Sequence, residues 1–151
     1  MPLVYLGLGS NLGDKEQNLN NAVSVLSQDI GKVLKLSSFY FSKPWGYQSK
    51  NEFVNAVLLL ETMYSPTEVL ARTQSIEIEM GRKAKTGIHY EDRLIDIDVL
   101  IFDDLIVDSP DLKIPHPFIT KRNFVLIPLA EIAPELIDPV TKTLFKNYIK
   151  P

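Results

Sequence analysis

The sequence contains no cysteine. It can therefore form neither a disulfide nor a thiolate metal site, and this absence is typical of proteins in a reducing cytoplasm. It also lacks any apolar run approaching the roughly 18 residues that indicate a membrane-spanning helix. Residues 1–5 lack the basic segment that opens a secretory signal peptide. We therefore expect a cytoplasmic protein without a membrane partner.

The sequence also has no excess of positive charge. It contains 16 Lys and Arg residues and 19 Asp and Glu residues, for a formal net charge of −3. Nucleic-acid binding usually needs a basic surface, so we expect no nucleic-acid partner. A phosphate-rich ligand would have to be met by local cations or by metal ions. The length of 151 residues and the hydrophobic fraction of 45% indicate one globular domain, residues 1–151.

The hydrophobic periodicity predicts an alternation of strands and helices. Strands are expected over 3–8, 32–42, 53–62 and 94–102, and helices over 15–30 and 66–80. A turn at Asp103–Asp104 predicts a hairpin with residues 105–107, and a short helix is expected over 123–132. This order predicts an α+β fold: a ferredoxin-like βαββαβ sheet with helices packed on it, an added β-hairpin and a C-terminal helical tail.

Both long helices have recognisable start and stop signals. Asp14 with Gln17 resembles a capping box, and Ser65 with Glu68 forms a second one before a proline at the first helical position. Gly31 and Gly81 are expected to end the two helices. A fold of this kind hosts many functions, so it does not by itself assign one.

The strongest chemical signal is the pair Asp96 and Asp98 on the last strand of the predicted sheet. Residues two apart on a strand share a face, so the two carboxylates project together while Ile95, Ile97, Val99 and Ile101 fill the core. Two divalent cations would relieve the repulsion and bridge phosphate oxygens. Oxygen ligands favour magnesium. The alternative is a solvated strand face that happens to alternate.

The segment just before this strand gathers positive charge. Arg82 follows the helix-ending glycine and Arg93 precedes the strand, with Lys83 and Lys85 between them. Cations beside paired carboxylates are the arrangement that neutralises a polyphosphate and positions its metal. The lysines could equally belong to a solvated surface, so Arg82 and Arg93 are the better candidates.

A second group of residues could bind a flat heterocycle. Phe53 and Asn55 share one face of a strand, next to a loop that carries Trp45. An aromatic ring beside a carboxamide can stack on a heterocycle and read its polar edge. The alternative is a core phenylalanine and a strand-end asparagine. In the same way, His116 lies between prolines and could contact a phosphate or decorate a turn, and Phe124 could belong to the core.

Residues 7–13 form a glycine-rich turn that only weakly matches a dinucleotide-binding fingerprint. The expected acidic residue is missing after the next strand, where Ser42 and Lys43 stand instead. No helix separates the next two strands, and no Walker A sequence is present. The glycines are better explained by a tight backbone turn near a ligand.

Several segments together resemble one enzyme family across essentially the whole chain. They are Gly9-Ser10-Asn11-Leu12, Ser37-Ser38-Phe39-Tyr40, Phe53-Val54-Asn55-Ala56, Gln74 with Glu77, Arg93 through Asp96 and Asp98, Ile114-Pro115-His116-Pro117, Arg122 with Phe124, and residues 128–134. This set resembles the 6-hydroxymethyl-7,8-dihydropterin pyrophosphokinases, folate-pathway enzymes that transfer diphosphate from ATP to a pterin alcohol and release AMP.

The resemblance implies a role for each matching residue. Asp96 and Asp98 would bind two Mg²⁺ ions, and Arg82 and Arg93 would be catalytic. The pterin-binding set would be Ser42, Lys43, Trp45, Phe53, Asn55 and Phe124, with the two phenylalanines sandwiching the ring. The ATP-binding set would be Gln74, Glu77, Lys85, Tyr90, the backbone of Val99, Lys113, His116 and Arg122. We expect a monomer whose partners are ATP and a hydroxymethyl dihydropterin.

The sequence departs from the family pattern in one loop. Glu91-Asp92 stands where the family often has Gly-Pro, Tyr90 replaces the usual tryptophan, and Ala84 leaves Lys83 or Lys85 to supply the cation. Two other functions remain open on the residues alone. One is another magnesium-dependent nucleotidyl or phosphoryl transferase, and the other is a non-catalytic ligand-binding domain. An oxidoreductase using a dinucleotide is a more distant third.

Overall fold

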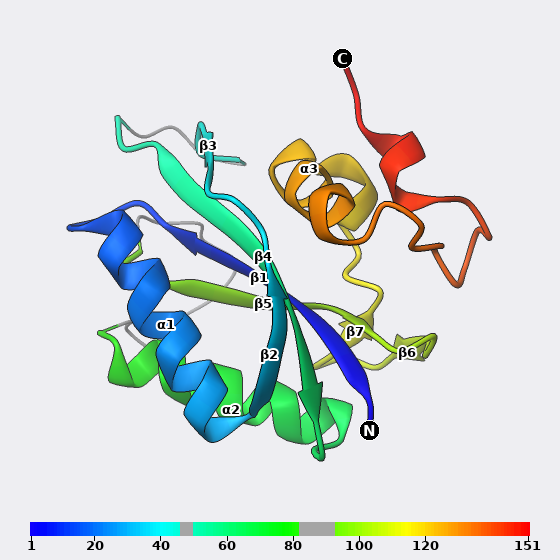
Figure 1. The fold of residues 1–151 in the computed structure, drawn as a ribbon, viewed down its shortest axis with the longest axis horizontal. Coiled ribbons are helices and arrows are strands. Elements are labelled where there is room, and N and C mark those ends of the chain that lie inside the picture. Colours follow the sequence, from blue (N-terminus) through cyan, green and yellow to red (C-terminus); the bar gives the residue numbers. More distant parts are fainter. Residues whose placement is uncertain (46–49, 82–92) are drawn as a thin grey trace.

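The structure is a computed structural model and describes residues 1–45, 50–81 and 93–151 (Figure 1). Its main sheet contains β1 (Leu3–Ser10), β2 (Gly31–Leu36), β3 (Tyr40–Ser42), β4 (Phe53–Thr62) and β5 (Asp96–Phe102). The strand order is β2-β4-β1-β5, with β3 also paired to β4, and the neighbouring strands run antiparallel. This order confirms the predicted ferredoxin-like arrangement.

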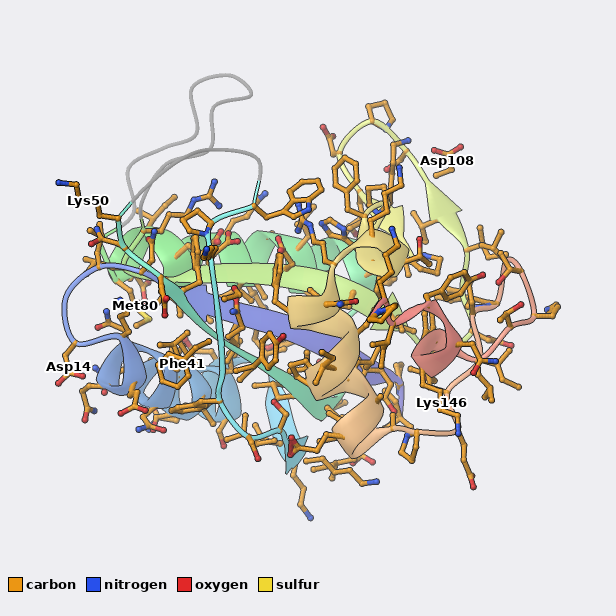
Figure 2. The ribbon with its side chains drawn as sticks, turned by 90° about the horizontal axis from the view of Figure 1, so that it is seen from above. Asp14, Phe41, Lys50, Met80, Asp108 and Lys146 are labelled. Carbon is orange, nitrogen blue, oxygen red and sulfur yellow. The ribbon has the colours of Figure 1, made fainter. Side chains whose placement is uncertain are left out.

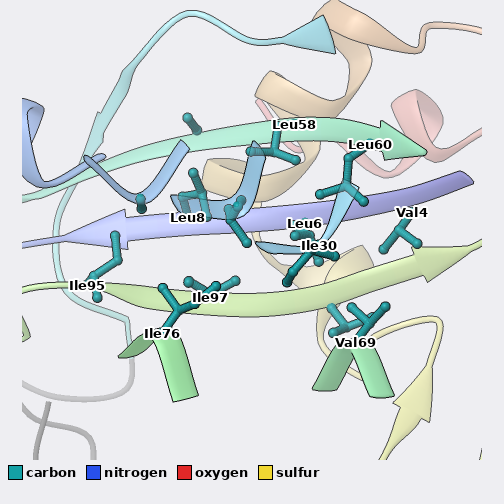
Figure 3. Close-up of a cluster of buried hydrophobic side chains, with 14 of the residues drawn as sticks. Val4, Leu6, Leu8, Ile30, Leu58, Leu60, Val69, Ile76, Ile95 and Ile97 are labelled. Atoms are coloured by element: carbon teal, nitrogen blue, oxygen red, sulfur yellow. The ribbon is translucent and has the colours of Figure 1, made fainter. Parts of the chain in front are cut away.

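Helices cover both faces of this sheet. Figure 1 shows α1 (Lys15–Asp29) and α2 (Pro66–Glu79) on one face and α3 (Asn123–Ile132) on the other. The first core lies under α1 and α2, where side chains of β1, β4 and β5 meet Val69 and Ile76 (Figure 3). The second core joins Val57 and Leu100 to Leu126, Leu129 and Phe145 of the C-terminal part. Two short helices flank α3 in the chain, η1 (Ile119–Lys121) before it and η2 (Phe145–Tyr148) after it.

The helix signals in the sequence act largely as predicted. The Ser65 side chain accepts a hydrogen bond from Glu68 N–H, and the Glu68 carboxylate accepts one from Ser65 N–H, so the second capping box is complete. Asp14 accepts a bond from Gln17 N–H, but the Gln17 side chain donates to Asn21 instead of returning. Gly81 has φ +105°, the left-handed conformation that ends α2.

Gly31 has a different role from the predicted one. It begins β2, and Ile30 is the residue that caps α1. A Cβ at Gly31 would lie 1.9 Å from the carbonyl oxygen of Glu61 on the paired strand. Glycine is therefore required for the close approach of β2 to β4, and a left-handed helix end is not the reason.

The strand predicted over 32–42 is divided into β2 and β3. Ser37 lies between them, where its N–H donates to Val57 O and its Oγ accepts from Val57 N–H, both at 2.9 Å. The hydroxyl thereby takes the place of a backbone carbonyl in the ladder. The pairing shifts by one residue across the break, from Leu36 opposite Leu58 to Tyr40 opposite Asn55.

Two further details of the prediction were wrong. Ile101 does not share a face with Ile97 and Val99, because an irregularity in the β1–β5 pairing leaves Leu100 extra and puts Ile101 in the second core. The added hairpin is formed by β6 (Val107–Asp108) and β7 (Lys113–Ile114), so Asp103–Asp104 turns the chain away from β5 without pairing residues 105–107 to it. Within the described ranges no helix is long and apolar enough to cross a membrane.

Candidate active site

Three strands bring the predicted polar residues into one row on the sheet. Gly9 of β1 is paired with Asn55 of β4 on one side and with Asp96 of β5 on the other. Directly opposite residues in a sheet face the same way. In the next such row, Gly7 lies between Val57 and Asp98. Asn55, Asp96 and Asp98 therefore share the face that carries α3.

The two glycines leave this part of the sheet without side chains between the polar groups. A Cβ at Gly9 would lie 3.3 Å from Asn55 Oδ1 and 3.4 Å from a ring carbon of Phe53. Glycine thus allows Phe53 and Asn55 to lie directly on the β1 backbone. The sequence predicted a tight backbone turn at these glycines, and this was wrong for Gly7 and Gly9, which lie within β1. Only Gly13, at φ +67°, has the left-handed conformation of a turn.

Each carboxylate of the pair has a guanidinium beside it. Arg93 Nη1 donates to Asp96 Oδ1 at 2.7 Å, with exposed side-chain fractions of 11% for Arg93 and 22% for Asp96. Arg122 Nη1 lies 3.8 Å from Asp98 Oδ2, and Asp98 is 28% exposed. Burial lowers the pKa of Arg93, but the charges of Asp96, Asp98 and Glu77 outweigh it and raise the pKa above its ordinary value. Arg93 therefore stays charged.

Glu77 is a buried carboxylate at the outer edge of β5. Its side chain is 4% exposed, and its Oε2 accepts a hydrogen bond from Ile97 N–H at 2.9 Å. It thus ties α2 to the edge strand and adds a third negative charge near Arg93. Gln74, one turn earlier on α2, is exposed. Both residues were predicted to contact ATP.

The same edge of β5 has backbone groups near a histidine. Backbone groups alternate sides along a strand, so those of Val99 face the same outer edge as those of Ile97. At the next residue of β5, Leu100 O accepts a hydrogen bond from His116 N–H at 2.9 Å. His116 Nδ1 accepts one from Phe118 N–H at 3.1 Å, so the neutral imidazole carries its proton on Nε2.

The orientation of the Asn55 amide is fixed by two acceptors. Its Nδ2 donates to Tyr40 O at 3.0 Å and to Ser42 Oγ at 2.8 Å. Its Oδ1 is the amide atom nearest to a Cβ that Gly9 would carry. The side chain therefore offers an acceptor toward the β1 side, and Ser42 contacts Asn55 through its hydroxyl. Lys43 is exposed.

Arg122 lies in a cluster of aromatic rings. Its guanidinium carbon is 4.3 Å from the ring centre of Trp45, 5.2 Å from that of Phe118 and 5.6 Å from that of Phe124. Arg122 is 8% exposed, and its Nε is buried without a hydrogen-bond partner among the described residues. A guanidinium held by aromatic faces beside Asp98 can present donors to an anion.

Some predicted site residues either lie away from the carboxylate pair and its arginines or fall outside the residues that the structure describes. Lys113 is exposed and pairs with Asp108 across the β6–β7 hairpin, and that contact lowers the pKa of Asp108. Figure 2 shows Asp108, the partner of Lys113, on the opposite side of the molecule from Lys50, which precedes β4. Arg82, Lys85 and Tyr90 were predicted to contact ATP or act in catalysis, and they lie outside the described residues together with Lys83.

The described residues contain no group of three or more His, Cys, Asp or Glu side chains that could hold a metal ion. Asp96 and Asp98 therefore supply at most two carboxylate ligands from this part of the chain. Mg²⁺ is commonly held by one or two carboxylates, with water and substrate phosphates completing the coordination. The pair thus fits a metal that binds together with a nucleotide.

Sequence reasoning missed two contributions to the site. Phe118 packs against Trp45 with ring centres 5.3 Å apart, and no spacing in the sequence connects these residues. Asn11 appeared only within a matched motif, although its side chain accepts a 2.6 Å hydrogen bond from Arg93 N–H. The two residues of that bond are 82 positions apart, so only the folded chain reveals the contact.

Comparison with known proteins identifies the family to which the chain belongs. Residues 5–134 match the family model described as 7,8-dihydro-6-hydroxymethylpterin-pyrophosphokinase (HPPK). The chain is 46% identical over 138 residues to the 2-amino-4-hydroxy-6-hydroxymethyldihydropteridine pyrophosphokinase of Porphyromonas gingivalis, covering 90% of this chain and 94% of that protein. The Aquifex aeolicus protein of the same name is 38% identical over 148 residues, covering 98% of this chain and 91% of the relative.

A solved structure of greater sequence distance supports the same fold. The wild-type HPPK-DHPS of Plasmodium falciparum matches with a TM-score of 0.78 at 16% identity. The match covers 98% of this chain and 40% of that longer chain, so the present chain corresponds in fold to one part of it. On the family match and the two bacterial relatives, the chain belongs to the HPPK family and is a pyrophosphokinase of folate biosynthesis, an ATP-using diphosphotransferase.

Proposed function

We propose that the shared sheet face is the site at which diphosphate moves from ATP to 6-hydroxymethyl-7,8-dihydropterin. The observation that carries the proposal is the row Asn55, Gly9 and Asp96 across β4, β1 and β5. The row aligns Asn55, which suits a heterocycle, with Asp96, which suits a metal-bound phosphate. Only Gly9 lies between them. The acceptor of the diphosphate and the phosphate chain can therefore meet above Gly9.

Asp96 and Asp98 are the residues we assign to magnesium. Both are partly exposed on one strand face, and two carboxylates are a sufficient protein share of a Mg²⁺ site when a nucleotide supplies further oxygens. Two Mg²⁺ ions held there would neutralise the charge of the phosphates. When the ions are absent, Arg93 and Arg122 balance the two carboxylates. Bound ions would take over that role and leave the two guanidiniums able to turn toward phosphate oxygens.

We assign the outer edge of β5 and its surroundings to ATP. The backbone of Val99 can hold adenine at this edge, and Gln74, Glu77, His116 and Arg122 surround the nucleotide and its phosphates. The buried Nε of Arg122 supports this assignment, because an anion would satisfy it. Lys85, Tyr90 and Lys113 complete the proposed ATP set on the family pattern alone.

The pterin is assigned to the β4 side of the row. Phe53 and Phe124 are partly buried aromatic residues on β4 and at the start of α3, and they would sandwich the ring. Asn55 Oδ1 would accept from an N–H of the pterin, since its amide nitrogen is already used by Tyr40 and Ser42. Lys43 and Trp45 complete the proposed pterin set.

Diphosphate transfer requires attack at the β-phosphorus. A bond forms between the pterin hydroxyl oxygen and the β-phosphorus, and the bond from that phosphorus to the oxygen bridging the α-phosphorus breaks. The β- and γ-phosphates move together, the hydroxyl proton is released and AMP leaves. Arg93, held beside Asp96, stabilises the charge on the transferring group, and Arg82 is assigned the same task from the family pattern.

We also propose that the chain acts as a monomer of one domain, residues 1–151, in the cytoplasm. The edge strand β2 supports the monomer, because exposed Lys32 and Lys35 lie on it and its pairing with β4 is irregular between Val33 and Lys35. Lysines and bulges discourage pairing of an edge strand with a second copy. The absence of cysteine supports a reducing compartment.

The test is a product assay. The protein is incubated with ATP, Mg²⁺ and 6-hydroxymethyl-7,8-dihydropterin, and the nucleotide products are separated. The proposal predicts equal amounts of AMP and pterin diphosphate. Formation of ADP would indicate γ-transfer and another transferase, and binding without turnover would indicate a ligand-binding domain.

A further inference from the structure

Asn11 is the first residue after β1 and forms hydrogen bonds with both the carbonyl and the N–H group of Arg93. Its backbone N–H donates to Arg93 O at 3.0 Å, and its Oδ1 accepts from Arg93 N–H at 2.6 Å. Its Nδ2 lies 3.5 Å from Asn51 O, which defines which end of the amide faces Arg93. Asn11 is fully buried, at 0% exposure. Both polar backbone groups of Arg93 are thus bound by one residue.

This contact is out of register with the sheet. The β1–β5 ladder pairs Leu8 with Ile97 and Gly9 with Asp96, so its continuation would pair Asn11 with Leu94. The structure instead joins Asn11 to Arg93, a slip of one residue. The slip is possible because the side-chain oxygen of Asn11 substitutes for a backbone carbonyl.

The slip decides which face Arg93 serves. Residues three apart on a regular strand point to opposite faces, so a continued β5 would direct Arg93 away from Asp96. A one-residue slip reverses the face of a side chain. The observed 2.7 Å contact between Arg93 Nη1 and Asp96 Oδ1 therefore depends on the chain leaving the ladder where Asn11 binds it.

We propose that Asn11 is a positioning residue for diphosphate transfer: it holds the Arg93 backbone out of register so that the guanidinium reaches the metal-binding face. Asn11 acts through Arg93 and does not itself touch the reacting atoms. The inference rests on the proposed function, because it assumes that Arg93 acts on the transferring group.

A double-mutant cycle on kcat tests the proposal. Arg93→Ala is expected to lower kcat by roughly 10²–10³-fold, as for loss of one charge-stabilising donor. Asn11→Ala is expected to lower kcat by about 10–100-fold, because a displacement near 1 Å can cost about 10²-fold. In the Arg93→Ala background, Asn11→Ala should change kcat by less than about threefold, since residues acting as one unit are not additive.

Asn18→Ala is the matched control. Asn18 is also an asparagine in the β1–α1 region, and its Nδ2 donates to Ser10 Oγ and Leu12 O without contacting Arg93. It should lower the melting temperature while leaving kcat within about twofold of the wild type, as expected for a loss of local support alone. A merely structural role of Asn11 would produce the same pattern in Asn11→Ala, and that result would overturn the inference.

Two further variants keep the test decisive. Asn11→Asp retains the acceptor for Arg93 N–H and should keep kcat within about fivefold of the wild type at matched folded fraction. Asn11→Ser, whose hydroxyl ends one bond short of Oδ1, replaces Asn11→Ala in the cycle if the latter is too unstable to assay. If the effects of the Asn11 and Arg93 variants on kcat multiply independently, the inference about Asn11 is overturned and the proposed function is unaffected. A wild-type kcat in Arg93→Ala would instead contradict the proposed function.

Discussion

Arg122 Nη1 lies 3.8 Å from Asp98 Oδ2 while the guanidinium of Arg122 rests 4.3 Å from the ring centre of Trp45. The two contacts connect a proposed metal ligand with Trp45, an aromatic residue in the loop after β3. The guanidinium is held by weak, adaptable contacts, so it can turn from the carboxylate to a phosphate without breaking a bidentate ion pair.

This arrangement predicts a specific cost for replacing Arg122 with lysine. A lysine ammonium keeps the charge but loses the planar fork and the stacking on aromatic rings. Arg122→Lys is expected to reduce kcat/KM for ATP by roughly 10–100-fold, about the worth of one or two hydrogen bonds to a charged group. Steady-state kinetics with varied ATP check this. The neighbouring exposed Lys121, replaced by Ala, is the control, and an Arg122→Lys enzyme with wild-type kcat/KM would disprove the assignment.

Asn55 is expected to act on the pterin alone. Asn55→Ala removes the fixed acceptor and should raise the KM for the pterin by roughly 10–100-fold, equivalent to about 1–3 kcal/mol for an unpaired polar group. The KM for ATP should stay within about twofold. Thr62→Ala is a control on the same strand, since Thr62 Oγ1 donates to Ile30 O at the far end of β4 and supports stability only. A rise of both KM values together would count against the assignment.

Gly31 is predicted to be intolerant of any side chain. A Cβ there would lie 1.9 Å from Glu61 O, and backbone of a central strand cannot move aside easily. Gly31→Ala should therefore lower the free energy of unfolding by about 3 kcal/mol, the upper part of the range for overpacking. Urea denaturation measures the loss. Gly13→Ala, at φ +67° but in a more open place, should cost only about 1 kcal/mol. Equal losses in the two variants would show that the close strand approach is not the cause.

The capping box of α2 predicts a pH effect on stability. Hydrogen bonds from the Ser65 backbone and then the Ser65 side chain lower the pKa of Glu68 below its ordinary 4.5. A lowered folded-state pKa contributes stability above the unfolded pKa, and that contribution is lost as pH falls through the folded value. The stability difference between the wild type and Glu68→Gln should therefore shrink as the pH is lowered below about 4.5. Denaturant titrations between neutral and acidic pH would reveal a constant difference if Glu68 played no such part.

The fold could be predicted from the sequence where local signals agree with tertiary packing. The bounds of β4 follow from its apolar run. The capping of α2 follows from Ser65 with Pro66, and the extent of α3 follows from apolar spacing. The shared face of Asp96 and Asp98 was predictable for the same reason. Alternation holds through the first residues of β5, before the irregularity at Leu100 changes the face of Ile101.

Contacts in which a side chain replaces a backbone group could not be predicted. Ser37 Oγ interrupts residues 32–42, which were predicted as one alternating strand, and two strands form there. Asn11 Oδ1 has the same function at the end of β1. In both cases the partner is distant in sequence and the effect is a shift of strand register. The local periodicity of the sequence carries no information about such a shift.

The central claim is that Asp96 and Asp98 hold the magnesium that diphosphate transfer requires. The most direct measurement is AMP release as a function of Mg²⁺ concentration in the wild type, Asp96→Asn, Asp98→Asn and the control Asp104→Asn, an exposed residue after β5. Binding of ATP with Mg²⁺ or with a chelator is measured by calorimetry on the same proteins. Asparagine preserves the size of each side chain, so the fold should persist.

The account predicts that AMP release by the wild type and Asp104→Asn depends on Mg²⁺. In Asp96→Asn and Asp98→Asn it should fall by at least about 10²-fold, and Mg²⁺ should no longer strengthen ATP binding. If either variant released AMP at nearly the wild-type rate with an unchanged Mg²⁺ dependence, the assignment of the carboxylate pair to magnesium would be contradicted.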